Sequence, residues 1–310
     1  MSALRETISH GLAEVGDIRL HYVELGGDET DDSSRPLEIL LHGFPQYWYA
    51  WRHQLEPLAA AGYHVVAPDL RGYNRSDRPA SVEAYRMEHH LADLRGLVDH
   101  FDPDSVTVVG HDWGGAFVWE AAVRHPDLFD RQVVLNFPHP GPYRRDLLTW
   151  RQLKRSWYVG FFLLPGLPET VLEHDDYAFV DRLFRDDPVD PDAFSETDIR
   201  RYKRALSRPG ALTAAVNYYR ALIPQYSRRL LVESVPFVDT GLPPTTSQID
   251  TPTMVIWGEQ DSTVVPSMAD GLEEWIPDVD VRRLPNASHW VQEDCPDTVT
   301  DHLLEFLRRY

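Results

Sequence analysis

The 310-residue sequence predicts an α/β fold with a mostly parallel central sheet, helices on both of its faces and an inserted helical cap. Up to residue 138, short β-branched runs alternate with helical patterns, which is typical of a parallel sheet. From 139 to 244 the apolar period is helical, and strand patterns return from residue 252. We therefore expect one core domain, 1–138 together with 245–310, and a cap over 139–244.

The elements of the core follow from their patterns in chain order. Extended segments on both sides of Val15-Gly-Asp predict an antiparallel hairpin over residues 11–26. Short apolar runs predict buried strands, at 37–45, 64–69, 106–111, 132–137, 252–258 and 279–284. Amphipathic runs predict helices, at 48–61, 87–101, directly after residue 112 and at 296–310.

The charge and cysteine content limit the partners and the compartment. The 30 basic and 49 acidic residues give a net charge of −19, which argues against nucleic acid or an anionic membrane as a partner. Only Lys154 and Lys203 are lysines, a bias that fits either adaptation to salt or an effect of base composition. Cys295 is the single cysteine, so a reducing compartment is expected. Because the sequence shows no signal-peptide pattern and no run long enough to span a bilayer, we expect a cytoplasmic protein.

The most informative stretch is Val106–Trp119, where an apolar strand pattern passes through Gly110-His-Asp-Trp-Gly into a helix. A turn this tight strains its central residue and leaves room only for glycine at the crowded flanking positions. The central residue is Asp112, whose carboxylate can attack a saturated carbon and form an ester that water must then cleave. The alternative is that Asp112 only caps the helix that follows it.

A carboxylate nucleophile needs a base for the second step, and the base needs an acid to orient it. Asp261 follows one predicted strand and His289 follows the last one, so both emerge at the same sheet edge as Asp112. Asp261 could instead be a turn residue, with Glu259 as a rival acid, and His289 could be an ordinary loop histidine. None of the 14 histidines belongs to a cluster with metal-ligand spacing.

The tetrahedral intermediate of ester cleavage requires two donors for its oxyanion. In strand–turn–helix sites of this kind they are backbone N–H groups of the residue after the nucleophile and of an earlier strand-end loop. The corresponding residues are Trp113 and Phe44. His42 and Pro45 would shape that loop and the pocket beside it, unless they serve only a structural turn.

Five motifs together resemble the epoxide hydrolases of the α/β-hydrolase fold, from Gly11 to the end of the chain. These are His42-Gly-Phe-Pro-Gln, Trp51-Arg-His-Gln, Gly110-His-Asp-Trp-Gly-Gly, Asn217-Tyr-Tyr-Arg and Ser288-His-Trp-Val-Gln-Glu. The resemblance implies conversion of a small apolar epoxide and water to a vicinal diol, without a cofactor, through an ester of Asp112.

The resemblance also implies two cap tyrosines that bind the epoxide oxygen, which we assign to Tyr158 and Tyr219. Trp113, Trp157 and Phe161 are expected to line the pocket with them, although the aromatic stretch around Tyr158 could simply fill the cap. A monomer or a homodimer is compatible with the resemblance.

Two other functions remain open within this fold. Haloacetate dehalogenases typically carry arginine where this sequence has Trp113 and Ala116, and many haloalkane dehalogenases carry asparagine in place of Phe44. Both often place the acid where Asn136 stands. Because the indoles of Trp113 and Trp157 could bind a halide, a haloalkane dehalogenase is the main alternative. A non-catalytic ligand-binding protein is the third hypothesis.

Overall fold

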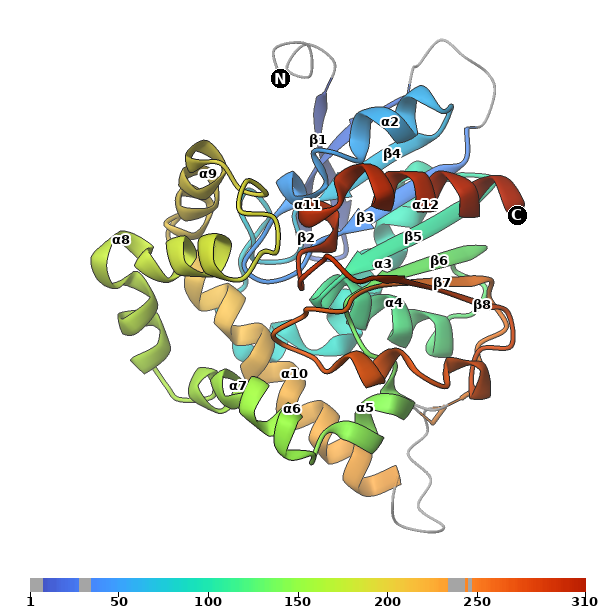
Figure 1. Cartoon of the computed structure of the whole chain (residues 1–310). Coiled ribbons are helices and arrows are strands. Elements are labelled where there is room, and N and C mark those ends of the chain that lie inside the picture. The colour runs from blue at the N-terminus through green and yellow to red at the C-terminus, as the bar shows by residue number, and fades with distance from the viewer. Residues whose placement is uncertain (1–7, 28–34, 234–242, 245–246) are drawn as a thin grey trace.

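The computed structural model describes residues 8–27, 35–233, 243–244 and 247–310, and Figure 1 shows its arrangement. One eight-stranded sheet runs through the core in the order β1-β2-β4-β3-β5-β6-β7-β8. Its strands are β1 Ser9–Val15, β2 Ile18–Leu25, β3 Leu37–Leu41, β4 His64–Pro68, β5 Val106–His111, β6 Arg131–Leu135, β7 Thr253–Gly258 and β8 Val279–Leu284.

The pairing of the strands confirms the predicted mostly parallel sheet. β2 pairs antiparallel with both β1 and β4, and all the other pairs are parallel. Strands β3, β5 and β7 are buried along their whole length, as central parallel strands covered by helices must be. The loops that follow β3, β5, β6 and β7 therefore emerge together at one edge of the sheet.

Helices cover both faces of this sheet (Figure 1). One apolar cluster joins α2 Leu55–Ala60 and α12 Pro296–Arg309 to the first face, with α11 Val291–Asp294 beside α12. A second cluster joins α3 Met87–Phe101 and α4 Trp113–Arg124 to the opposite face and continues into the helices between β6 and β7. Short 3₁₀ turns complete the core, η1 Trp48–Trp51, η2 Val82–Tyr85, η3 Pro266–Ala269 and η4 Leu272–Glu274.

The described residues between β6 and β7 contain helices and no strand. These helices are α5 Pro140–Asp146, α6 Trp150–Arg155, α7 Trp157–Phe162, α8 Leu167–Asp186, α9 Glu196–Leu206 and α10 Ala211–Glu233. In Figure 1 they gather on one side of the sheet, with the long α10 lying next to α7 and α8. The predicted domain boundaries at 138/139 and 244/245 stay predictions, and residues 234–242 and 245–246 near the second boundary lie outside the described residues.

Candidate active site

Asp112 stands on a sharp bend between β5 and α4. Its backbone has φ 51° and ψ −121°, which is strained for a residue other than glycine. Glycine is required nearby, because a Cβ on Gly114 would lie 2.4 Å from the backbone oxygen of Leu41. The Asp112 side chain makes no capping hydrogen bond to the helix. This geometry therefore gives no support to the helix-cap interpretation and leaves the carboxylate available above the sheet edge.

The structure brings the predicted acid and base to this carboxylate. Nε2 of His289 lies 3.7 Å from Oδ2 of Asp112, and Nδ1 of His289 donates to Oδ2 of Asp261 at 2.9 Å. Asp261 and His289 are only 1% and 3% exposed. The rival acid Glu259 instead accepts a hydrogen bond from Arg283 at 2.7 Å, away from His289.

Asn136 and Thr263 hold the acid in place, and the sequence reasoning missed both of these roles. The amide nitrogen of Asn136 donates to Oδ2 of Asp261 at 2.5 Å, and its amide oxygen accepts from the N–H of Gly258 at 2.9 Å. The other Asp261 oxygen accepts the backbone N–H and the hydroxyl of Thr263. Asn136 thus occupies the position considered for an acid, but it acts as a donor to the acid on the neighbouring strand.

Two further contacts fix the loops that carry the acid and the base. His111 is fully buried, and its Nε2 donates to the carbonyl oxygen of His289 at 2.9 Å. From α6, Arg155 donates to the carbonyl oxygen of Asp261 at 2.5 Å. Helix α6 therefore contacts the loop of Asp261 directly.

The charges in the site shift one another's pKa values. Burial disfavours the charged form of His289, but the carboxylates of Asp261 and Asp112 outweigh it and raise the pKa of His289 to about 10. For Asp261, burial likewise opposes ionisation, but His289, Thr263 and Asn136 together lower its pKa to about 2. The pKa of Asp112 is also lowered, because the pull of His289 exceeds the effect of burial. These shifts favour an ionised carboxylate–imidazolium–carboxylate array in the resting site.

One of the two expected oxyanion donors already contacts the carboxylate. The backbone N–H of Phe44 donates to Oδ1 of Asp112 at 2.7 Å. Close approach of the two loops depends on Gly43, where a Cβ would lie 2.3 Å from the Asp112 side chain. Trp113, the source of the second expected donor, is the first residue of α4, where backbone N–H groups have no partner within the helix.

A cavity of about 670 Å³ lies above Asp112, between the sheet edge and the inserted helices. Asp112 and His289 line it from the core, and Tyr158 of α7 and Tyr219 of α10 line it from the opposite side. The rings of the two tyrosines are 6.1 Å apart. Burial raises the pKa of both hydroxyls, so each stays protonated and can donate a hydrogen bond. Trp113, Phe137, Gln152 and Ser156 line the same space.

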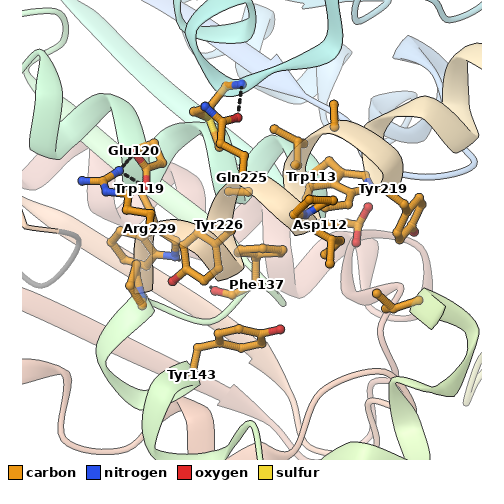
Figure 2. Close-up of a pocket in the computed structure, with 18 of the residues that line it drawn as sticks. Asp112, Trp113, Trp119, Glu120, Phe137, Tyr143, Tyr219, Gln225, Tyr226 and Arg229 are labelled. Carbon is orange, nitrogen blue, oxygen red and sulfur yellow. Dashed lines mark hydrogen bonds and ion pairs between the residues drawn. The ribbon is translucent and has the colours of Figure 1, made fainter. Parts of the chain in front are cut away.

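The cavity extends along α10, away from Asp112. In Figure 2 the Asp112 carboxylate lies beside Trp113 and Tyr219, whereas Glu120 and Arg229 lie at the other end of the view. Arg229 donates to both oxygens of Glu120, at 3.0 and 2.7 Å, which neutralises the charge at that end. The part of the cavity next to Asp112 is lined mainly by aromatic rings.

Four residues expected to shape the pocket do not line this cavity. The side chain of Trp157 is 70% exposed, because Tyr158 points inward and its neighbour on the short helix α7 points out. Phe161 is half-buried against Phe162 and outside the lining. His42 and Pro45 are buried under the loop, where Nε2 of His42 accepts the N–H of Leu70 at 3.0 Å. The structure supports a structural role for the last two.

The described residues contain no group of three or more histidine, cysteine or acidic side chains arranged to hold a metal ion.

The comparisons with known proteins agree with this arrangement. A model of the alpha/beta hydrolase fold family matches residues 39–296. The chain is 35% identical to AB hydrolase superfamily protein YfhM of Bacillus subtilis, over 94% of this chain and 95% of that protein. It is 35% identical to epoxide hydrolase 3 of Xenopus tropicalis, over 96% of this chain and 78% of that protein.

The chain is also similar to solved structures of epoxide hydrolases. A mutant epoxide hydrolase from Bacillus megaterium, crystallised with its product, matches 96% of this chain and 100% of its own, with a TM-score of 0.82 and 30% identity. The predicted fold and the resemblance stated from the motifs are both confirmed. The chain belongs to the α/β-hydrolase-fold family and, within it, to the group of the epoxide hydrolases.

Proposed function

We propose that this protein hydrolyses epoxides to vicinal diols through a covalent ester on Asp112. The observation that carries the proposal is the meeting, in one cavity, of the Asp112 carboxylate, the His289–Asp261 pair and the hydroxyl-bearing rings of Tyr158 and Tyr219. These are the groups that a two-step hydrolysis needs. The relatives named epoxide hydrolases support the same activity.

In the first step, Oδ2 of Asp112 attacks an epoxide carbon and the bond from that carbon to the ring oxygen breaks. Oδ1 becomes the carbonyl oxygen of the ester, because the N–H of Phe44 already holds it. The ring oxygen leaves as an alkoxide and takes up a proton from a tyrosine hydroxyl. The imidazolium of His289 restores that proton across the cavity, which leaves the histidine neutral for the second step. An alkoxide is a poor leaving group in an apolar pocket, so donation from Tyr158 and Tyr219 lowers the barrier.

In the second step, His289 removes a proton from water and the hydroxide attacks the carbonyl carbon of the ester. Charge then develops on Oδ1, where the N–H groups of Phe44 and Trp113 stabilise it. Collapse of the intermediate breaks the bond between the carbonyl carbon and the substrate oxygen, which takes the proton of the newly formed carboxyl group. The diol then leaves, with Asp112 again a carboxylate and His289 again an imidazolium. Asp261 holds the imidazole in the tautomer whose Nε2 faces the water.

Turnover of a small panel, epoxides against chloro- and bromoalkanes, tests the activity. We expect diol formation from apolar epoxides and no comparable release of halide. The dehalogenase alternative is weakened because Trp157 is 70% exposed, so only the Trp113 indole remains near the nucleophile to bind a halide. Halide release in the absence of epoxide turnover would replace the proposal with that alternative.

Substitution of the two cap tyrosines tests their role in the first step. Each of Tyr158→Phe and Tyr219→Phe should slow ester formation by roughly 10–10²-fold, and the pair together by more than either, because each change removes a donor to the developing alkoxide. The measurement is the single-turnover rate of ester formation with enzyme in excess.

Tyr218→Phe is the matched control for this test. Its hydroxyl donates to the carbonyl oxygen of Arg71 at 2.7 Å, outside the cavity, so the change should cost stability and spare the rate. An unaffected double variant of Tyr158 and Tyr219 would remove both from the mechanism.

The finer expectations about the setting also remain proposals. We infer a cytoplasmic enzyme that acts on a small apolar epoxide with water and works as a monomer or a homodimer. The single Cys295 and the apolar lining around Asp112 support the first two of these inferences. A sedimentation measurement on the purified chain decides the last.

A further inference from the structure

The helices that cover the cavity carry a group of exposed apolar side chains on their outer side. They are between 39% and 80% exposed and follow one another along the connection before α6, α6, α7 and the turn after α7. We call them the cap patch: Leu148, Trp150, Leu153, Trp157, Leu163 and Leu164. Single exposed apolar residues are ordinary on a protein surface, whereas a group of this size marks an interaction site.

The sequence segment that carries the cap patch has a charge opposite to that of the whole chain. No acidic residue occurs between Asp146 and Glu169, although the protein contains 49 of them. Both of these flanking carboxylates are paired, Asp146 with Arg145 at 2.9 Å and Glu169 with Arg220 at 2.6 Å. Within the stretch, Arg151 and Lys154 are exposed and form no ion pair with any residue that the structure describes.

We propose that the cap patch docks this protein onto the surface of a membrane that contains anionic phospholipids. Exposed tryptophan and leucine side chains beside arginine and lysine are the combination that binds the boundary between headgroups and acyl chains. Lys154 lies 5.2 Å from the centre of the Trp150 ring, so the cation and the indole are presented together. The net charge of −19, which argues against an anionic membrane as a partner, averages over this local distribution.

A second copy of the chain fits this surface less well. In a symmetric dimer formed by the cap patch, the same patch of each copy makes the interface. That interface would bring together Arg151 and Lys154 of both copies, an arrangement that like charges oppose, and the described segment offers no unpaired acidic side chain to compensate them. An anionic lipid surface instead supplies the opposite charge and an apolar layer at once.

The docking would be peripheral and would place the cavity close to the lipid. None of the described helices is long and apolar enough to cross a bilayer. The helices that carry the cap patch also reach inward, since Ser156, Tyr158 and Val159 line the cavity. Apolar epoxides partition into membranes, so docking would bring the cavity to its substrate. This benefit rests on the proposed function, whereas the docking itself does not.

Co-sedimentation with lipid vesicles, in the absence of any epoxide, tests the proposal independently of catalysis. We expect the full chain to bind vesicles of phosphatidylcholine mixed with phosphatidylglycerol, and to bind pure phosphatidylcholine much more weakly. Replacing Arg151 and Lys154 by Gln should weaken binding to the mixed vesicles by roughly 25-fold, since each cation near an anionic surface contributes a factor of about five. High salt should weaken the binding of the unchanged protein in the same direction.

The apolar part of the surface is tested by Leu148→Ser combined with Trp150→Ser, which should abolish the binding. Leu12→Ser is the matched control, because Leu12 is 52% exposed on β1, away from the inserted helices in Figure 1, and it should leave binding unchanged. Thermal melting of each variant checks that it is folded.

Three results would overturn the proposal. The first is no binding to mixed vesicles, and the second is equal binding to both kinds of vesicle. The third is a dimer in lipid-free solution that the Leu148 and Trp150 changes convert to a monomer, because this result would assign the cap patch to a second copy.

Discussion

Replacing Asp112 by Ala is expected to lower kcat for epoxide hydrolysis by at least on the order of 10⁴-fold, the scale seen when a covalent nucleophile is removed. The size of this effect follows from the position of the side chain. Among the described residues, no other side chain near Asp112 combines a negative charge with a contact to an expected oxyanion donor, because Asp261 is turned toward Asn136 and Thr263. Water could then attack the epoxide only directly, without the ester route.

The measurement is steady-state turnover of an apolar epoxide, with Asp112→Asn as the second variant. Asparagine keeps the shape of the side chain and an oxygen for the N–H of Phe44, but it is not a nucleophile of comparable strength. Both variants should melt as cooperatively as the unchanged protein and both should be inactive. Activity in Asp112→Asn, with the amide shown intact by mass spectrometry, would exclude the carboxylate as nucleophile.

An isotope experiment on the unchanged protein tests the same residue without any mutation. In a single turnover in ¹⁸O water with enzyme in excess, the label should appear in the Asp112 carboxylate, because hydroxide attacks the ester carbonyl carbon. The diol should then keep an oxygen that came from Asp112. Label found only in the diol would mean that water attacks the substrate directly.

The sequence determines most of the core through local patterns. Strands and helices appear where the β-branched runs and amphipathic runs predict them, for example Met87–Phe101 as α3 and Val279–Leu284 as β8. The predicted helix at 48–61 is interrupted, and forms the 3₁₀ turn η1 and the short helix α2. Periodicity locates an element well because its signal repeats, whereas the exact ends depend on local hydrogen bonding.

The candidate site could be predicted only as far as chain order and sheet topology allow. Asp112, Asp261 and His289 each follow a parallel strand, so a shared edge follows from the fold alone. The hydrogen bond from Asn136 to Asp261 joins residues 125 positions apart and depends on side-chain rotation. A polar residue at the end of a strand, such as Asn136, is a sequence signal for such a role, and in the structure its φ is 45°. The sequence does not specify its hydrogen-bond partner.

The sequence could not predict which side chains on the short inserted helices face the cavity. Trp157 and Tyr158 are adjacent aromatic residues on a six-residue helix, and about 100° separates consecutive side chains around a helix axis. With one turn and a half, no repeating pattern indicates which of the two faces the cavity. The local charge of the cap was also hard to predict, because the net charge of all 310 residues does not reveal the basic segment between Asp146 and Glu169.

The electrostatics of the array explain how His289 can serve as a base although its pKa is raised to about 10 in the resting site. That elevation needs two carboxylates. Ester formation removes the charge of Asp112, so the pKa of His289 must fall when the intermediate forms. The histidine therefore holds the nucleophile's charge in the resting enzyme and becomes a competent base at neutral pH only after alkylation. Removing His289 takes away the base of the second step, whereas in the first step the N–H of Phe44 still stabilises the Asp112 carboxylate, so the second step should slow more than the first.

Replacing His289 by Gln is expected to trap the ester. Alkylation of Asp112 should continue, while hydrolysis should slow by roughly 10²–10⁴-fold, the usual contribution of a positioned general base. Intact-protein mass spectrometry after mixing with a reactive epoxide should show a mass increase equal to that of the epoxide. Peptide mapping should place the added mass on the segment that contains Asp112.

The double variant Asp112→Ala with His289→Gln is the matched control for trapping, because it keeps the other residues that line the cavity. It should gain no mass, since the group that is alkylated is absent. The ester should also disappear from His289→Gln more slowly than from the unchanged protein at every pH, since the group that activates water is gone. An unmodified His289→Gln protein that still makes diol would show that water reaches the epoxide without an ester. A modified one that turns over at the normal rate would show that another residue activates the water.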